Sequence, residues 1–203
     1  AHGNEPSHHM AYLYNYIGKP SKTQKYVAKI LNEQYSEHPD GLSGNEDCGQ
    51  MSSWYVFSSL GFYPVTPGHE YYAIGTPLFK KGKINLENNN SFTIKAKNIS
   101  NKNIYIQAAK LNGQEYNKSY LHHSTILNGG EIEFTMGNKP SNWGENEIPV
   151  SKITQHQIVA VPFFSSSSQT FVKSHTIELG TVDGSDIFYS LNNSEYKKYD
   201  KPI

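Results

Sequence analysis

The sequence has 203 residues, and its 18 basic side chains balance its 18 acidic ones. Every basic residue is lysine, so the chain lacks the positive excess and the arginines with which nucleic-acid-binding proteins hold phosphates. No apolar run approaches the roughly 18 residues that a membrane-spanning helix needs. The one cysteine, Cys48, excludes an internal disulfide, which is compatible with the cytosol or with a secreted protein stabilised by its core.

Residues 1–62 have the pattern of helices joined by glycine-containing turns. Apolar residues at helical spacing predict a first helix from about residue 7 to residue 17. A second helix is expected to begin near Ser21, with Gln24 three residues later in a capping-box arrangement. A third helix, roughly residues 51–60, is apolar on most sides, so we expect it to be deeply buried.

After residue 70 the pattern changes to short segments in which polar and apolar residues alternate. Turns rich in Asn and Gly separate these segments. The expected strands are residues 84–86, 92–96, 104–108 and 132–136. The pattern predicts a β-sandwich-like region up to about residue 140.

The chain divides into four expected parts. These are a helical part (1–69), a β-rich part (70–145), a connector that ends in a serine run (146–172), and the start of a small β-module (173–203). The β-module is expected to contain strands at residues 176–179 and 187–191 and is not finished by the chain. Neither end resembles a natural terminus, so we expect the sequence to be a piece of a larger protein.

Two polar loops that each lead into a helix are the strongest candidates for chemistry. The first contains Asn4, Glu5, His8 and His9, and the second contains Asn45, Glu46, Asp47 and Cys48. Carboxylates on such loops can bind a hard cation through oxygen or act as acid and base. An aromatic run from Trp54 to Tyr63 follows the second loop, and aromatic rings suit sugars. Together these features indicate glycoside hydrolysis.

Structural explanations of the same residues stay open at this point. An Asp or Asn before a helix is often simply its cap, and His8 and His9 could be packing or surface histidines. One cysteine and an adjacent histidine pair do not supply the usual tetrahedral zinc ligands. A nucleophilic Cys48, activated by the following helix, is less favoured than the acids beside it.

Two stretches of the sequence resemble glycoside hydrolase family 92. They are residues 3–9 (GNEPSHH) and 41–64 (GLSGNEDCGQMSSWYVFSSLGFYP), and shorter matches at 72–77 and 111–113 extend the resemblance over about residues 1–145. The resemblance implies a secreted, cell-surface or periplasmic bacterial exo-α-mannosidase with an N-terminal β-sandwich and an (α/α)6 catalytic barrel. The expected fold class is therefore mixed α and β: the last helices of such a barrel, followed by β-sandwich-like segments.

The resemblance also assigns catalytic roles in the second loop. Asp47 matches the base that activates water in an inverting release of terminal α-linked mannose, with α-1,2 linkages expected. Its neighbour Glu46 is the second catalytic candidate. Asn45 stands where many family members have a second acid, which leaves Asp47 as the stronger base candidate.

A calcium ion that holds the mannose hydroxyls is the cofactor that the resemblance implies. The expected calcium ligands are Asn4 and Glu5. The expected sugar-binding residues are Glu5, His8, His9 and Asn45.

The family's general acid lies upstream of residue 3 and is absent from this chain. We therefore expect mannose-containing glycans as substrates, the N-terminal part of the same protein as a partner, and no activity from this chain alone. Two alternatives are a non-catalytic carbohydrate-binding or structural fragment, and a processed subunit that pairs with an N-terminal partner. Residues 176–203 resemble the start of the small β-sandwich at the C-termini of bacterial chitobiases and related hexosaminidases, which implies an appendage.

Overall fold

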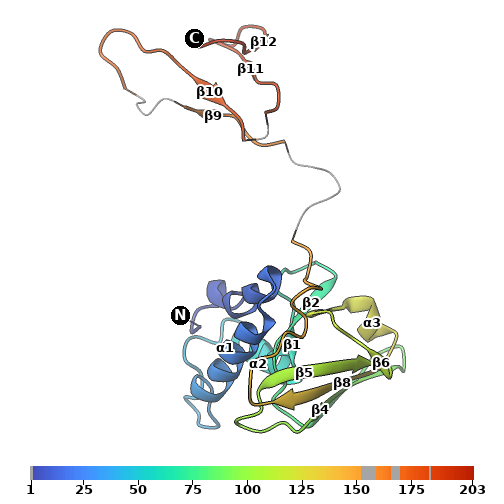
Figure 1. Ribbon diagram of the computed structural model, residues 1–203. Helices are drawn as coiled ribbons and strands as arrows, with labels where there is room; N and C mark the ends of the chain where they lie inside the picture. Colours follow the sequence, from blue (N-terminus) through green and yellow to red (C-terminus); the bar gives the residue numbers. More distant parts are fainter. Residues whose placement is uncertain (1, 152–158, 166–169, 183) are drawn as a thin grey trace. The chain divides into compact units, whose positions relative to one another are not determined.

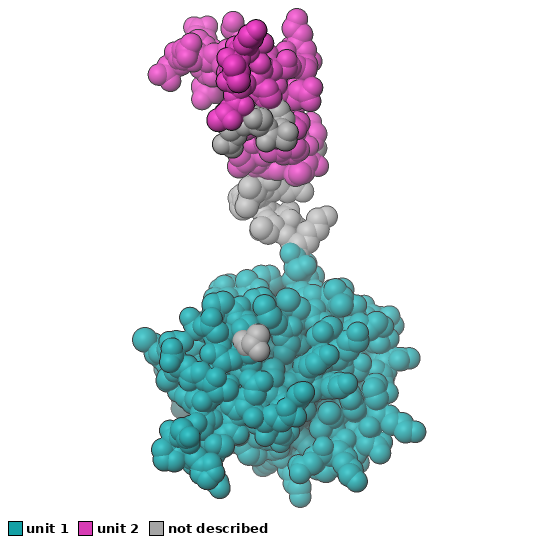
Figure 2. All heavy atoms as spheres, turned by 90° about the vertical axis from the view of Figure 1, so that its left-hand side faces the viewer, with its two compact units in different colours: residues 1–151 teal, residues 152–203 magenta. Residues whose placement is uncertain are grey.

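The computed structural model describes residues 2–151, 159–165, 170–182 and 184–203 (Figure 1). The chain divides into two compact units, residues 1–151 and residues 152–203 (Figure 2). Residues 152–158 and 166–169 of the expected connector, which include most of the serine run, lie outside the described residues. Among the residues that are described, no helix is both long and apolar enough to cross a membrane.

The helices of unit 1 come first in the chain. Two 3-10 helices, η1 (Glu5–Ser7) and η2 (Met10–Ile17), stand where one continuous helix was expected. The α-helices α1 (Pro20–Glu33) and α2 (Gln50–Leu60) agree with the second and third predicted helices. These helices lie together on one side of unit 1 in Figure 1. The expected (α/α)6 barrel stays a prediction.

The predicted capping box at the start of α1 is wrong. Lys19 occupies the capping position and makes no side-chain hydrogen bond there. Gln24 is instead buried, and its Oε1 accepts a hydrogen bond of 3.1 Å from the backbone N–H of Ile106. A buried amide must find a partner, so Gln24 ties α1 to the sheet rather than to its own helix.

The strands of unit 1 form two sheets. The larger has the order β3-β4-β8-β5-β6, with β4 and β8 parallel and the other pairs antiparallel. Its strands are β3 (Lys81–Asn85), β4 (Ser91–Lys97), β5 (Tyr105–Leu111), β6 (Gln114–Glu115) and β8 (Gly130–Gly137). The smaller sheet has the order β1-β2-β7, from β1 (Phe62–Tyr63), β2 (Tyr71–Ile74) and β7 (Tyr120–His122). A short helix, α3 (His123–Leu127), follows β7.

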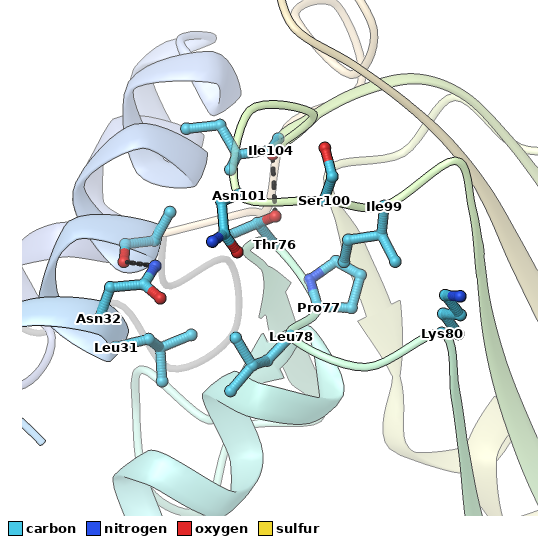
Figure 3. A pocket seen from close by; sticks show the side chains of 11 residues that line it. Leu31, Asn32, Thr76, Pro77, Leu78, Lys80, Ile99, Ser100, Asn101 and Ile104 are labelled. Carbon is cyan, nitrogen blue, oxygen red and sulfur yellow. Dashed lines mark hydrogen bonds between the residues drawn. The ribbon is translucent and has the colours of Figure 1, made fainter. Parts of the chain in front are cut away.

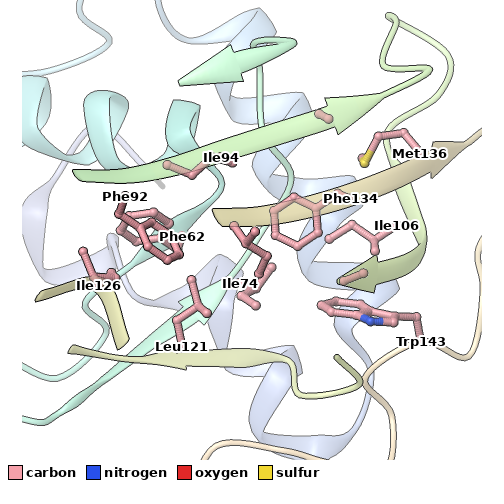
Figure 4. Packing of buried hydrophobic residues seen from close by; sticks show 13 residues of the cluster. Phe62, Ile74, Phe92, Ile94, Ile106, Leu121, Ile126, Phe134, Met136 and Trp143 are labelled. Carbon is pink, nitrogen blue, oxygen red and sulfur yellow. The ribbon is translucent and has the colours of Figure 1, made fainter. Parts of the chain in front are cut away.

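One hydrophobic core lies between the two sheets (Figure 4). Phe62, Ile74 and Leu121 enter it from the small sheet, while Ile94 and Phe134 enter it from the large one. Burial alternates along β4 and β8, as expected for strands with one face on a core. The four predicted strands of this region are confirmed, and the shared core agrees with the β-sandwich-like expectation.

A second core joins the helices to the small sheet. Its members are Ala11, Tyr12, Val27, Leu31, Trp54, Tyr63 and Ala73. The expectation that α2 is buried on most sides is wrong for this chain, because Val56 is 56% exposed. Trp54 of α2 and the following Phe62 are nevertheless fully buried. The sheets and the second core cover these rings, and the open side of α2 carries Val56 instead.

Unit 2 contains two short hairpin-like pairs. β9 (Phe163–Phe164) pairs with β10 (Leu179–Gly180), and β11 (Phe188–Tyr189) pairs with β12 (Lys197–Lys198), both antiparallel. The predicted strands at 176–179 and 187–191 overlap β10 and β11. β9 lies within the range expected to be a connector. Ile187 is the only large hydrophobic side chain that is buried among the described residues of this unit.

Candidate active site

Two glycines bring the two predicted loops into direct contact. A Cβ atom added to Gly44 would collide with the backbone carbonyl of Gly3, and one added to Gly3 would collide with the carbonyl of Ser43. Any residue other than glycine at these positions would force the two backbones apart. The close approach therefore places the loop that carries Glu5 beside the loop that carries Asp47.

Glu5 and Asp47 form a carboxyl pair across this contact. The hydrogen bond to Glu5, followed by partial loss of solvent and the negative charges of Glu5 and Glu46, raises the pKa of Asp47. The pKa of Glu5 is lowered by its own backbone N–H and then by the hydrogen bond from Asp47. Two adjacent carboxylates oppose each other's ionisation, so Asp47 is the member of the pair whose pKa is raised.

The backbone that presents Asp47 is unusual. Asp47, Cys48 and Gly49 are three consecutive residues in the left-handed region, with φ values of 48°, 56° and 89°. Residues with a Cβ adopt this region at a cost of about 1–2 kcal/mol each, and such strain is common at functional sites. The turn ends at α2, where the N–H of Gln50 donates to the carbonyl of Asp47 over 3.2 Å.

Glu46 is engaged in holding the start of α2. Its Oε1 accepts a hydrogen bond of 3.0 Å from the backbone N–H of Ser52, and its Oε2 accepts one of 2.6 Å from the Ser52 hydroxyl. These two bonds lower the pKa of Glu46. Both oxygens are occupied, so the geometry favours Asp47 over Glu46 as the base.

His8 contacts aromatic and polar groups on several sides. Its ring stacks on His2 with centroids 4.7 Å apart, and its backbone carbonyl accepts a hydrogen bond of 3.0 Å from Trp54 Nε1. Its Nδ1 lies 3.2 Å from the Nε2 atom of Gln50. Burial is the main cause that lowers the pKa of His8, and a hydrogen bond to the backbone of His2 followed by the nearby carboxyl groups of Glu5 and Asp47 oppose this shift.

His2 belongs to the first polar loop of the sequence but was not assigned a role in the site. Its Nε2 lies 2.7 Å from the hydroxyl of Tyr35. Burial and the neighbouring His8 lower its pKa to about 4, so both histidines are neutral at pH 7. Gln50 ends the second polar loop and likewise was not assigned a role.

The remaining predicted residues lie at the edge of this arrangement. Asn4 and Asn45 are exposed, and His9 is half-buried. The carbonyl of Asn4 accepts hydrogen bonds from the backbone and hydroxyl of Ser7, so this residue starts η1. Cys48 is exposed. The structure thus brings Glu5, His8 and Asp47 together.

The carboxyl and amide oxygens of the site could supply some of the ligands of a hard cation. Glu5 and Asp47 offer adjacent carboxyl groups, and Asn4 and Asn45 add amide oxygens from the same loops. Calcium takes 6–8 oxygen ligands. Within the described residues no group of three or more His, Cys, Asp or Glu side chains is arranged to hold a metal ion. These residues could therefore supply only a share of a calcium shell.

A separate hollow lies between α1 and the loops around residues 76–80 and 99–104 (Figure 3). Its volume is about 170 Å³. Thr76 donates a hydrogen bond of 2.8 Å to the carbonyl of Ile104, and Asn32 donates one of 2.7 Å to the carbonyl of Ala28. None of the predicted site residues lines it, so it is distinct from the carboxyl pair.

Comparison with known proteins identifies close relatives. The model of the glycosyl hydrolase family 92 catalytic domain matches residues 1–138. The family GH92 α-mannosidase BT3965 of Bacteroides thetaiotaomicron, solved in complex with mannoimidazole, is 43% identical with a TM-score of 0.71, over 74% of this chain and 20% of that chain. The inverting mannosidase BT2199 of the same organism is also 43% identical, with a TM-score of 0.69, over 74% of this chain and 21% of that chain.

A relative from another organism is also described as a glycosidase. An uncharacterized secreted glycosidase of Arthroderma benhamiae is 36% identical over 154 residues, which cover 73% of this chain and 20% of the relative. The chain thus spans about a fifth of the length of the relatives that it matches.

Proposed function

Since the chain belongs to glycosyl hydrolase family 92, we propose that the protein releases terminal α-linked mannose from glycans, with inversion at the anomeric carbon. The solved relatives support the sugar and the stereochemistry, because one is described as an α-mannosidase and another as an inverting mannosidase. The α-1,2 linkage is our expected substrate. Export from the cell is part of the proposal, supported by the description of the Arthroderma relative as secreted.

The observation that carries the proposal is the carboxyl pair of Glu5 and Asp47. A base that removes a proton from water works best when its pKa lies closer to the working pH than that of an ordinary aspartate. The bond to Glu5 raises the pKa of Asp47, which makes Asp47 the stronger base of the two. Once deprotonated, Asp47 would take a proton from water as the water oxygen attacks the anomeric carbon.

The neighbouring residues would position the base and the sugar. Glu5 holds the Asp47 carboxyl in place, and Glu46 fixes the start of α2 immediately after the turn. His8, His9 and Asn45 are proposed to contact the sugar hydroxyls. His8 is well suited to this because it is neutral and held by its neighbours.

Calcium is the proposed cofactor, with Asn4 and Glu5 among its ligands. When bound, it would polarise and orient the hydroxyls of the sugar, the chemistry that a hard cation supplies to oxygen ligands. The general acid of an inverting enzyme stands roughly 6.5–9.5 Å from the base. We propose that the acid and the other calcium ligands come from the remainder of the family's polypeptide, N-terminal to this segment.

The replacement Asp47→Asn tests this assignment in the full-length protein with an α-1,2-linked mannobiose. Loss of a general base lowers turnover by about 10²–10⁴-fold, and we expect KM to change little because the amide keeps the shape of the carboxyl. Asp40→Asn, at an exposed position of the preceding loop, is the matched control and should retain turnover.

Near-normal turnover of Asp47→Asn would remove Asp47 from the role of base. No mannose release from the wild-type protein with calcium present would instead favour a non-catalytic carbohydrate-binding role.

A further inference from the structure

Ser52 binds both oxygens of one carboxylate, through its backbone and its side chain. Its backbone N–H donates to Oε1 of Glu46 over 3.0 Å, and its hydroxyl donates to Oε2 over 2.6 Å. A hydroxyl bond of this length is typical of an ionised acceptor and is stronger than a bond between neutral groups. Glu46 directly precedes Asp47, and Ser52 lies in the first turn of α2. The two bonds therefore bridge the left-handed turn that lies between these residues.

The left-handed turn of Asp47, Cys48 and Gly49 needs such a restraint. Asp47 and Cys48 have φ values of 48° and 56°, a conformation that is costly for residues with a Cβ atom and persists only where the surroundings enforce it. Packing does not enforce it here, because Cys48 is exposed and a Cβ atom added to Gly49 would meet no atom within 4 Å. Hydrogen bonds must therefore supply the restraint.

Helix capping explains only one of the two bonds to Glu46. Gly49 stands at the capping position of α2 and has no side chain to offer. The bond from the backbone N–H of Ser52 to Glu46 satisfies an amide of the first helical turn in its place. The hydroxyl bond satisfies no backbone group of the helix, and Ser52 is exposed, so its hydroxyl could bind water instead. What the hydroxyl bond does fix is the direction in which the carboxylate of Glu46 points.

We propose that Ser52 is a positioning residue for Asp47. Its hydroxyl holds the carboxylate of Glu46, and Glu46 in turn holds the left-handed turn in the conformation that sets the Asp47 carboxyl against that of Glu5. The effect of Ser52 on turnover rests on the proposed function. Its effect on the backbone does not, because every contact involved lies within residues 1–203.

NMR coupling constants of the 203-residue chain, which report φ, test the effect on the backbone. Ser52→Ala removes the hydroxyl and keeps the backbone bond that caps α2. We expect the φ angles of Asp47 and Cys48 to leave the left-handed region for part of the time in this variant. Ser53→Ala, the same change at the next exposed position, should leave both angles as in the wild type. Left-handed angles that persist unchanged in Ser52→Ala would overturn the proposal.

Turnover of the full-length protein shows whether this restraint matters for the base. Misplacing a reacting group by about 1 Å can cost roughly 100-fold, and we expect Ser52→Ala to lower kcat about tenfold or more with little change in KM. Ser52→Thr keeps the hydroxyl and should restore most of the loss, while Ser53→Ala should lose nothing. Equal kcat in Ser52→Ala and Ser53→Ala, or a loss that Ser52→Thr does not restore, would overturn the positioning role.

A double-mutant cycle in the full-length protein tests whether Ser52 acts through Glu46. If it does, Ser52→Ala should cost nothing further in a protein that already carries Glu46→Ala, so the two losses in kcat are not additive as free energies. Losses that multiply independently would overturn the route through Glu46. A wild-type protein that releases no mannose would overturn the proposed function, and the φ angles of the turn would still decide the positioning role.

Discussion

At the scale of single residues, the contact between Gly3 and Gly44 determines whether the site exists at all. The two glycines let one backbone touch the other, and this contact sets the carboxyl of Asp47 against that of Glu5. Glycine is needed here for space rather than for an unusual φ, because neither residue has a positive φ.

The replacement Gly44→Ala should therefore separate the two loops. Its Cβ would overlap the carbonyl of Gly3, and overpacking of this kind lowers the free energy of unfolding by about 1–3 kcal/mol. Urea unfolding of the 203-residue chain measures this change. Ser43→Ala, at an exposed neighbouring position, removes atoms instead of adding them and should unfold like the wild type. Equal stability of Gly44→Ala and Ser43→Ala would show that the loops are not in contact.

The sequence could identify the site residues by type but not their arrangement. Glu5 and Asp47 stand on separate loops 42 positions apart in the numbering of the chain, and no local pattern indicates that their carboxyl groups interact. Glu46 and Asp47 are adjacent acids, yet only the structure shows that Ser52 occupies both oxygens of Glu46. Gln50 carries no charge and was not among the predicted residues. Its contact with His8 depends on the position of His8 in three dimensions.

At the scale of helices and strands, the core between the two sheets is the larger of the two buried clusters of unit 1. Phe134 of β8 is 1% exposed and meets the ring of Trp143 edge-on, with centroids 6.3 Å apart. Ala96 of β4 lies beside it in the parallel register. Phe134 thus packs between β4 and the later segment that carries Trp143.

Truncation of this ring should strongly destabilise unit 1. Phe134→Ala is expected to lower the free energy of unfolding by about 3–5 kcal/mol, the usual range for a buried phenylalanine. Val56→Ala, on the exposed side of α2, should change it by no more than about 0.5 kcal/mol. Chemical denaturation followed by tryptophan fluorescence would compare the two variants. A cost for Phe134→Ala no larger than that for Val56→Ala would contradict the assigned core.

Periodicity predicted the positions of the strands, but it carries no information on how they pair. Residues 92–96 and 132–136 alternate in polarity, and they became β4 and β8. Nothing in either segment indicates that the two strands pair in parallel, since pairing depends on the path of the intervening chain. Gln24 was misread for a related reason. Its local pattern fits a helix cap, but tertiary burial gave its amide a partner on β5.

At the scale of the whole molecule, the proposed enzyme needs more polypeptide than these 203 residues. The chain spans about a fifth of the length of its relatives, and within the described residues only part of a calcium shell is present. We therefore propose that the general acid and the remaining calcium ligands lie in the rest of the full-length protein.

Removal of divalent metal should abolish mannose release by the full-length protein. The candidate ligands are carboxylate and amide oxygens, which favour calcium over softer metals. We expect a chelator to stop turnover, added calcium to restore it, and zinc to restore little of it. Turnover that continues unchanged after exhaustive chelation would show that Asn4 and Glu5 serve another purpose.

The anomeric form of the first sugar released by the full-length protein tests the central claim most directly. If Asp47 acts as a base on water rather than as a nucleophile, the reaction is a single displacement that inverts the anomeric carbon. Proton NMR at the start of hydrolysis, before mutarotation, distinguishes the two anomers. We predict that β-mannose appears first from an α-linked substrate with the wild-type protein. Release of α-mannose as the first product would contradict the assignment of Asp47 as the base in an inverting mannosidase.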